Sequence, residues 1–358
     1  MKRCVYILAA ALLALTSCSF EKKEDMRSSC DYARYFDIVQ LHADDTIRTA
    51  VVTFSPYNAT ADTLVLDKPL DRLICMSSSQ VAGLAEIEAE NAIAAVSGLK
   101  YITNNELHRR NIPDIGYEAS LDYEKVLELK PDVLLAYTIS GAEPPYLARL
   151  RSLGVRVLVL HDHLENHPLA RAEYIRLYGA LTGHQIQADS SFAAICARYD
   201  SLAVESDSQK KFKVLMNVPY GDAWYIPGED SYMSQLIRDA GGEVMGAKPG
   251  TAVSRVVSLE EAYQLSQSAD IWLNPGPCAT RDELMAFHHS FRMFGPVAKG
   301  LPIYNNTLRT NPEGGNDFWE SGSVRPDLIL ADLVAIFSAV ESGQSDRCDS
   351  LEYHFQVK

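Results

Sequence analysis

The chain contains 358 residues, of which 47% are hydrophobic, and its formal net charge is −14. A chain of this length exceeds what one hydrophobic core usually holds, so the sequence predicts two domains. The acidic excess disfavours the counterion-release binding that phosphate backbones require, which argues against a nucleic-acid partner.

The N-terminus predicts an export signal with a lipid-attachment site. A basic start is followed by an apolar run from Val5 to Leu15, and about eleven apolar residues are too few to cross a hydrocarbon core of about 30 Å as a helix. Leu15-Thr16-Ser17-Cys18 resembles a bacterial lipobox. The resemblance implies that residues 1–17 are removed and that Cys18 carries the lipid, with residues 18–30 as a polar tether.

The remaining cysteines do not predict a disulfide framework. Beyond the signal and Cys18 they lack CxxC or zinc-finger spacing, and they are Cys30, Cys75, Cys196, Cys278 and Cys348. Cys30 and Cys348 flank the predicted folded region, so a disulfide between them stays open beside the alternative of buried thiols.

Residues 31–165 are predicted to form the first lobe. Phe36–Val39 and Thr49–Phe54 are rich in β-forming residues and predict a short antiparallel appendage. Continuous apolar runs then alternate with helical stretches: Leu73–Met76, Ile93–Val96, Val133–Tyr137 and Val155–Leu160, with helices at Tyr123–Leu129 and Tyr146–Leu153. Continuous apolarity is typical of parallel strands that helices cover on both faces.

An interlobe helical segment is predicted at residues 166–206. Pro168–Leu181 and Gln185–Leu202 have helical patterns, with a break at Thr182-Gly183. In the second piece, five side chains recur in steps of four and three and therefore share one face: Ala188, Phe192, Ile195, Tyr199 and Leu202. At 1.5 Å per residue this helix spans roughly 25 to 30 Å. Such a stiff connection is expected to permit little lobe motion.

Residues 207–358 repeat the alternation and predict a second lobe. Its apolar runs are Val214–Met216, Val244-Met245, Ile271–Leu273 and Ile303-Tyr304. The expected fold class is therefore α/β, with two lobes that each hold a mainly parallel sheet flanked by helices. Ligands of open α/β sheets bind outside the carboxyl ends of the strands, so we expect a cleft that both lobes share.

Several short motifs follow one another in a fixed order between Leu70 and Phe337. They are Arg72–Ser79, Glu124–Leu135, Leu153–Val157, Gly179–Gly183, Ser258–Glu261, Ala269–Leu273, Asp317–Glu320 and Arg325–Leu328. Together they resemble the helical-backbone substrate-binding lipoproteins of ABC importers for ferric siderophores, haem and cobalamin. Two departures stand out: Ser77-Ser78-Ser79 replaces the Ser-Pro-Ser common in that family, and residues 30–67 match nothing in it.

The resemblance implies a binding protein without enzyme activity or intrinsic cofactor. Its transported ligand would be a metal chelate or tetrapyrrole held in the cleft, and its partner an ABC permease with ATPase subunits. Glu124 and Glu260 match the positions that dock onto the permease, and carboxylates suit such contacts with arginine. The alternative is that both glutamates only favour a helix N-terminus. A monomer, lipid-anchored at the periplasmic face of a bacterial membrane, is expected.

Loops that follow the predicted strands supply the candidate ligand contacts. They are Ser78, Tyr137 and His161 in the first lobe, and Tyr220, Trp224, Tyr225, Asn274, Arg281, Asn305 and Trp319 in the second. Haem or a corrin favours aromatic walls with a few polar anchors, and a catecholate siderophore favours Arg and Tyr. For each aromatic residue the alternative is simple packing of a loop.

His161-Asp162-His163 ends a predicted strand, so its two imidazoles are expected on the same side, where they could share a metal or an axial position. The alternative is that they are surface or capping histidines. A Zn or Mn importer would need further ligands, for which His288 and His289 are available. No GxxxxGK[ST], GxGxxG or GxSxG motif occurs. The alternatives left open are an exported two-lobed α/β enzyme, a metal-ion (Zn/Mn) binding lipoprotein, and a lipoprotein that senses or stores its ligand.

Overall fold

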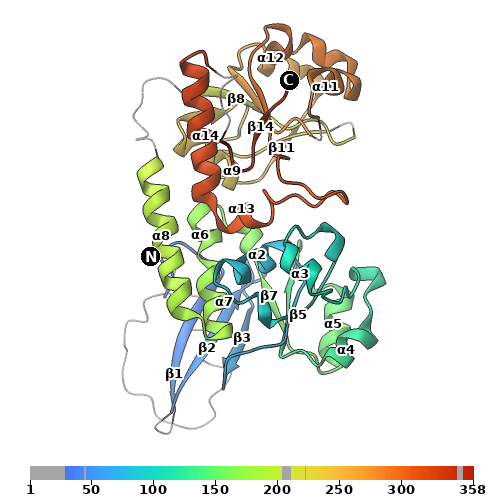
Figure 1. Ribbon diagram of the computed structural model, residues 1–358, viewed down its shortest axis with the longest axis vertical. Coiled ribbons are helices and arrows are strands. Elements are labelled where there is room, and N and C mark those ends of the chain that lie inside the picture. Colours follow the sequence, from blue (N-terminus) through green and yellow to red (C-terminus); the bar gives the residue numbers. More distant parts are fainter. Residues whose placement is uncertain (1–28, 44–45, 204–210, 222, 277, 345–349) are drawn as a thin grey trace.

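The computed structural model describes residues 29–43, 46–203, 211–221, 223–276, 278–344 and 350–358. Two α/β lobes are stacked along the long axis, and two long helices run along one side of the molecule (Figure 1). These helices are α8 (Gln185–Leu202) and α14 (Pro326–Glu341), which pack against each other. The predicted fold class, two lobes with mainly parallel sheets flanked by helices, is confirmed.

The N-terminal lobe is built on a four-stranded parallel sheet in the order β5-β4-β6-β7. Its strands are β4 (Leu73–Cys75), β5 (Ile93–Val96), β6 (Val133–Tyr137) and β7 (Val157–Leu160). Its helices are α2 (Ser78–Glu86), α3 (Asn105–Arg109), α4 (Tyr123–Leu129) and α5 (Pro145–Ser152), with short helical turns η1 (Glu90–Ala92), η2 (Leu99–Tyr101), η3 (Glu118–Ser120) and η4 (Asp162–Leu164). Helices cover the sheet, so every residue of β4 is buried.

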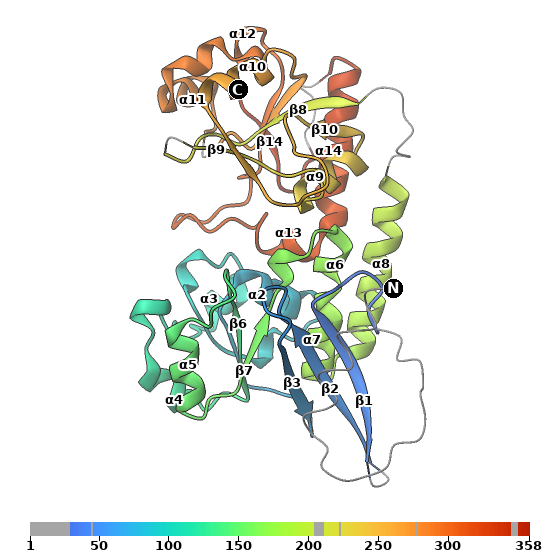
Figure 2. The ribbon, with the colours of Figure 1, turned by 180° about the vertical axis from the view of Figure 1, so that it is seen from behind.

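The appendage is a three-stranded antiparallel sheet of β1 (Phe36–Ala43), β2 (Thr46–Phe54) and β3 (Ala61–Leu66). The sequence predicts the first two strands; the third completes the sheet. It lies against α7 (Tyr174–Thr182) and β7 at the side of the N-terminal lobe (Figure 2). The ring of Phe36, whose centroid is 4.6 Å from that of Tyr174, anchors this contact in the core.

Two buried carboxylates bind the segment before β1, residues 31–35, which leads into the appendage. Glu173 accepts the backbone N–H groups of Asp31, Tyr32 and Ala33 at 2.7, 2.8 and 2.7 Å. Glu165 accepts those of the next two residues, 34 and 35, at 2.6 and 3.0 Å. Five consecutive N–H groups are therefore satisfied by side chains that lie more than a hundred residues away in the sequence.

The connection between the lobes is helical, as predicted. It consists of α6 (Pro168–Ala172), α7 and α8. Gly183 ends α7 with a φ of +77°, a left-handed conformation that glycine adopts without steric penalty. The predicted face of α8 is confirmed, since four of its five members are buried and Leu202 packs at the edge of the core: Ala188, Phe192, Ile195 and Tyr199.

The C-terminal lobe contains a sheet in the order β10-β8-β12-β13-β14, in which only β14 is antiparallel. Its strands are β8 (Phe212–Met216), β10 (Gly242–Val244), β12 (Ile271–Leu273), β13 (Ile303–Asn305) and β14 (Phe355–Gln356). A separate ladder joins β9 (Trp224–Ile226) to β11 (Arg255–Val257). The helices are α9 (Tyr232–Asp239), α10 (Leu259–Ser266), α11 (Arg281–Phe287), η5 (His289–Met293) and α12 (Gly295–Ala298).

The chain also returns from the C-terminal lobe to the N-terminal lobe before α14 begins. The returning segment ends in α13 (Ser321–Val324), which packs against α2 (Figure 1). Glu320 accepts the backbone N–H groups of Thr103 and Asn104 at 2.7 and 2.9 Å. Burial raises the pKa of Glu320 to about 7. These contacts tie the lobes together in addition to the helical connection that the sequence predicts.

Candidate ligand-binding site

The carboxyl ends of the N-terminal strands are linked to one another by side chains. Ser77 caps α2, and the predicted contact Ser78 is half-buried in the first turn of that helix. The hydroxyl of Ser79 donates to Oδ2 of Asp162 at 2.8 Å. The end of β4 is therefore tied to the end of β7, with the half-buried serines between them.

The end of β7 brings two histidine rings together. The ring centroids of His161 and His163 are 6.4 Å apart, and that of the predicted contact Tyr137 lies 5.9 Å from His163. Burial and, to a smaller extent, the neighbouring His163 lower the pKa of His161 to about 4. The two imidazoles are neighbours, as the sequence predicts.

The appendage adds two tyrosines to this cluster. The rings of Tyr35 and Tyr57 approach that of His161 edge-on, at centroid distances of 6.3 and 6.1 Å. The β2–β3 turn that carries Tyr57 is held in place by Asn58, whose amide donates to the carbonyl of Gly141 at 3.3 Å. Sequence reasoning missed both tyrosines, because they lie more than a hundred residues from His161 and no local pattern links them to it.

A small polar cavity of about 190 Å³ lies beside this cluster, between the appendage and the loop after β6. His161 forms part of its wall. Arg151 spans the same region, since it forms ion pairs of 2.9 Å with both Asp62 and Glu143. The appendage is thus fastened to the carboxyl edge of the first sheet by charged as well as aromatic contacts.

Three of the predicted contacts in the C-terminal lobe are exposed. Tyr220 is 84% exposed, Tyr225 44% and Trp319 49%. Tyr225 lies opposite Val256 in the β9–β11 ladder, and Val256 is itself 58% exposed. These side chains are available to a ligand or a partner without rearrangement of the core.

Two further predicted contacts of this lobe, Trp224 and Asn305, have partners inside it. Trp224 is 1% exposed and donates from Nε1 to the carbonyl of Met216 at 2.9 Å. The buried amide of Asn305 donates to the carbonyls of Gly276 and Cys278. The polar groups of both side chains are already satisfied within the lobe. Their roles as ligand contacts stay predictions.

Arg281 and Asn274 differ in how far their polar groups are satisfied. Arg281 donates to the carbonyls of Pro296 and Leu301, and burial lowers its pKa. Asn274 has a φ of +56°, and its buried Oδ1 has no hydrogen-bond partner among the described residues. Of these two side chains, Asn274 is the one with an acceptor still to be satisfied.

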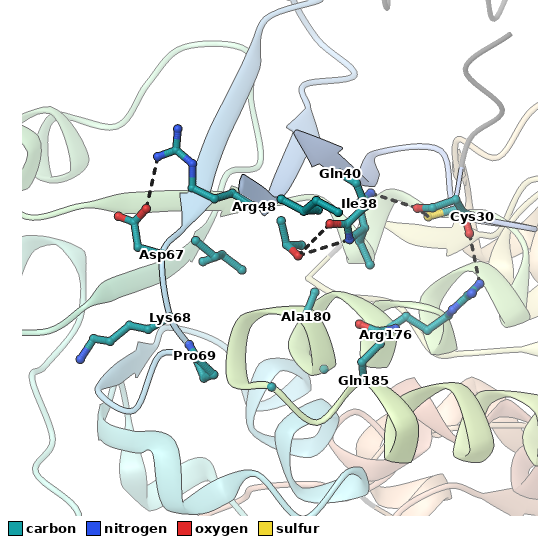
Figure 3. A pocket seen from close by; sticks show the side chains of 16 residues that line it. Cys30, Ile38, Gln40, Arg48, Asp67, Lys68, Pro69, Arg176, Ala180 and Gln185 are labelled. Carbon is teal, nitrogen blue, oxygen red and sulfur yellow. Dashed lines mark hydrogen bonds and ion pairs between the residues drawn. The ribbon is translucent and has the colours of Figure 1, made fainter. Parts of the chain in front are cut away.

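A larger cavity, of about 690 Å³, lies between the appendage and the α7–α8 turn (Figure 3). Both arginines that line it have partners: Arg48 pairs with Asp67 at 3.3 Å, and Arg176 pairs with Glu173 at 3.1 Å and Asp189 at 2.8 Å. Arg176 also donates to the carbonyl of Ser29. The described residues that line this cavity lie between Ser29 and Gln185, and none of them belongs to the C-terminal lobe.

Comparison with known proteins places this architecture in a family. Residues 73–285 match the family described as periplasmic binding protein. The chain belongs to this family. The matched region begins at β4, so it leaves the appendage outside, and it ends in α11 of the C-terminal lobe.

Two curated relatives of this periplasmic binding protein are both 22% identical to it. One is an uncharacterized lipoprotein of Methanocaldococcus jannaschii, matched over 76% of this chain and 66% of the relative. The other is an uncharacterized ABC transporter substrate-binding lipoprotein of Bacillus subtilis, matched over 52% and 57%. The chain therefore spans just under two thirds, or less, of the length of these relatives.

Solved structures share the fold at low sequence identity. The periplasmic haem-binding protein of Vibrio cholerae is 19% identical, with a TM-score of 0.56 over 72% of this chain and 98% of that one. The periplasmic vitamin B12 binding protein of the same organism is 15% identical, with a TM-score of 0.55 over 76% and 98%. At this identity the likeness concerns the fold.

The two predicted docking glutamates lie in the first turns of helices, one in each lobe. Glu124 is exposed on α4, which Asp122 caps. Glu260 is exposed on α10, and hydrogen bonds from its own backbone N–H and from the Ser258 hydroxyl lower its pKa. Both positions are compatible with docking and with a favourable interaction with the helix dipole, so the docking role stays a prediction.

Some predicted features lie outside the described residues. They are the signal, Cys18 with the tether up to residue 28, and Cys348, so the lipid site and the pairing with Cys30 stay predictions. The last two residues of the predicted tether, Ser29 and Cys30, are described, and Cys30 is buried. Within the described ranges, no helix is long and apolar enough to cross a membrane. In that same part of the chain, no group of three or more His, Cys, Asp or Glu residues is arranged to hold a metal ion.

Proposed function

We propose that this periplasmic binding protein is the substrate-binding lipoprotein of an ABC importer, and that it carries its ligand without transforming it. The observation that carries the proposal is the placement of side chains at the strand ends of two lobes. The N-terminal lobe offers half-buried Tyr137, with the buried His161 in the same cluster, and the C-terminal lobe offers exposed Tyr220, Tyr225 and Trp319. A ligand held between these side chains is bound by both lobes.

The ligand that suits this arrangement is an iron chelate of the siderophore type, cobalamin or haem. Aromatic walls with a few polar anchors favour flat, partly apolar molecules. The haem-binding and vitamin B12 binding proteins that share the fold support the same choice. The protein supplies no resident cofactor in this scheme, because the chelate or tetrapyrrole is its cargo.

The mechanism is binding with a few degrees of lobe closure. The α8 and α14 helices and the contacts of Glu320 with Thr103 and Asn104 limit how far the lobes can separate. Docking of both lobes on the permease then distorts them and releases the ligand, and the ATPase subunits drive its passage. Lipid on Cys18 would hold the monomer at the periplasmic face of the membrane.

Purification from native cells tests the ligand class. We expect a bound small molecule whose absorbance, checked by mass spectrometry, shows a Soret band, a corrin spectrum or the charge-transfer band of a ferric chelate. Addition of the same compound to the unloaded protein should raise its melting temperature, since a ligand at 100 times its Kd adds about 2.7 kcal/mol. Conversion of that compound by the protein alone would favour an exported enzyme instead.

Charge reversal tests the docking role. Glu124→Arg and Glu260→Arg should each abolish stimulation of the permease ATPase while ligand binding stays unchanged, because both carboxylates lie on exposed helix starts. Glu128→Arg, on an exposed position of the same α4 helix, is the matched control and should retain stimulation. If both reversals leave stimulation intact, the two glutamates do not dock.

A further inference from the structure

The inner face of the appendage sheet is only partly covered by the helix that it packs on. Ile38 pairs with Val51 in the β1–β2 register, and Ile47 lies four residues before Val51, so the three side chains share one face of the sheet. Val51 is fully buried at the contact between β2 and α7, whereas Ile47 is 67% exposed. Ile38 and Ile47 line the cavity of about 690 Å³ between the appendage and the α7–α8 turn.

The opposite wall of this cavity carries few side-chain atoms. It is formed by Gly179, Ala180 and Gly183 of the α7–α8 turn (Figure 3). A Cβ atom at Gly179 would lie 2.6 Å from the Cβ of Ala188, and Gly183 has a φ of +77°, so both positions favour glycine. The described side chains therefore leave the space open, and its volume is within the range of about 300–1,000 Å³ that small-molecule sites occupy.

The polar groups of the cavity differ between its two ends. At one end Arg48 and the exposed Lys68 supply two cations, with Asp67 as the one carboxylate of the lining. The side chains of Arg48 and Asp67 are 47% and 79% exposed, and exposed ion pairs stabilise little, so Arg48 can exchange Asp67 for another carboxylate. At the other end Arg176 is engaged by two carboxylates. The open end is therefore the one that favours an anion.

We propose that this cavity binds an amphipathic carboxylate, such as a medium-chain fatty acid. Its apolar chain would lie between Ile38 and Ile47 on one side and Ala180 on the other, and its carboxylate would contact Arg48 and Lys68. The sheet side of the cavity belongs to the appendage, which precedes the region that matches the family. The inference therefore goes beyond the proposed function and does not depend on it.

Dodecanoate is the probe that tests the ligand class. Calorimetric titration of the purified protein, below the concentration at which micelles form, should show one equivalent bound. Octanoate has four fewer methylene groups and should bind at least about tenfold more weakly, because each buried methylene contributes to affinity. Dodecanol has the same chain without the charge and should also bind at least about tenfold more weakly, because it cannot form the charged contact with Arg48.

Substitutions on the sheet side test the site itself. Arg48→Glu and Ile47→Asp change exposed side chains, so both variants should fold, and each should weaken dodecanoate binding at least about tenfold. Arg109→Glu, which reverses another exposed arginine of an ion pair, is the control for the first variant. Ile139→Asp, on an isoleucine that is 79% exposed, is the control for the second. Both controls should bind dodecanoate as the wild type does.

The outcomes separate this site from the interlobe cleft. Absence of one-equivalent binding to the wild type, unchanged affinity of either folded sheet variant, or an equal loss in its control overturns the site. Equal affinity for dodecanol and dodecanoate overturns the assignment of the ligand as an anion. Trp319→Ala, in the proposed cleft, should leave dodecanoate binding unchanged, and a loss there would move the binding to the cleft and overturn the proposal. A failure to stimulate any permease would overturn only the transport function.

Discussion

The two lobes build similar parallel sheets around different cores. In the N-terminal lobe one face of the sheet packs on aliphatic side chains such as Ile74, Leu134 and Leu147. In the C-terminal lobe Trp224 and Trp272 stack at 5.9 Å, and Phe291 and Phe294 pack against them. The difference shows that an aromatic residue near a strand end predicts ligand contact only when the core has not already buried it.

The two lobes can also be compared by the hydrogen bonding of their buried polar side chains. The C-terminal lobe satisfies Trp224 and Asn305 internally. Among the described residues, nitrogens of His161 and His163 in the N-terminal lobe have no hydrogen-bond partner, and neither has Oδ1 of Asn274 in the C-terminal lobe. Both lobes therefore have polar atoms without partners near their strand ends, and the aromatic core is the feature that distinguishes the C-terminal lobe.

Substitutions in the aromatic core should lower the free energy of unfolding more than the other substitutions considered below. Trp272→Ala is expected to lower the free energy of unfolding by about 4 kcal/mol, because a fully buried ring leaves a cavity. Tyr225→Ala, on the exposed side of the β9–β11 ladder, should change it by less than about 0.5 kcal/mol. Urea denaturation measures both, and equal effects would contradict the division between core and binding face.

Substitution of the carboxylates that bind residues 31–35 should have the next largest effect on the free energy of unfolding. Glu173→Ala leaves three backbone N–H groups without an acceptor and is expected to lower the free energy of unfolding by about 3 kcal/mol. Amide hydrogen exchange should accelerate in β1 and β2. Glu143→Ala, which removes an exposed carboxylate of an ion pair, is the control and should lower the free energy by less than about 1 kcal/mol.

The contact between the lobes should depend on pH. Burial raises the pKa of Glu320 from its usual 4.5 to about 7, so between these values the folded protein holds a proton that the unfolded chain lacks. The contribution of Glu320 to the free energy of unfolding should therefore increase as the pH falls from 7 toward 4.5, and it should be lost as the pH rises through 7.

Comparison of the wild type with Glu320→Gln isolates this effect. The free energy of unfolding of the wild type, relative to the variant, should increase by about 2 kcal/mol between pH 8 and pH 5. Denaturation at several pH values measures it, with Glu341→Gln as the control, since Glu341 is exposed near the end of α14. A constant difference between wild type and Glu320→Gln would show that Glu320 does not titrate in this range.

Local sequence patterns were sufficient for most strands. Continuous apolar runs identified β4, β6 and β12, because a strand buried on both faces needs apolar side chains at every position. The steps of four and three in α8 identified its buried face. The imidazoles of His161 and His163 are neighbours as predicted, but they lie beyond β7, in the η4 turn and at its start, so strand geometry does not explain their proximity.

Which strand-end side chains remain available could not be read from such patterns. Trp224 and Tyr225 are adjacent in the sequence, yet one is buried in the core and the other is exposed. Their alternation follows from the β9–β11 pairing, which joins segments about thirty residues apart. Burial of a loop residue depends on the elements that pack over it.

The sequence by itself determined the two-lobed α/β architecture, the helical connection and the pair of histidines, since each depends on residues close together in the chain. Only the tertiary structure decided that Tyr35 and Tyr57 flank His161, that Glu165 and Glu173 hold residues 31–35, and that Glu320 joins the lobes. These contacts link segments more than a hundred residues apart. Folding of the chain brings such segments together, and local periodicity in the sequence does not predict which distant segments will meet.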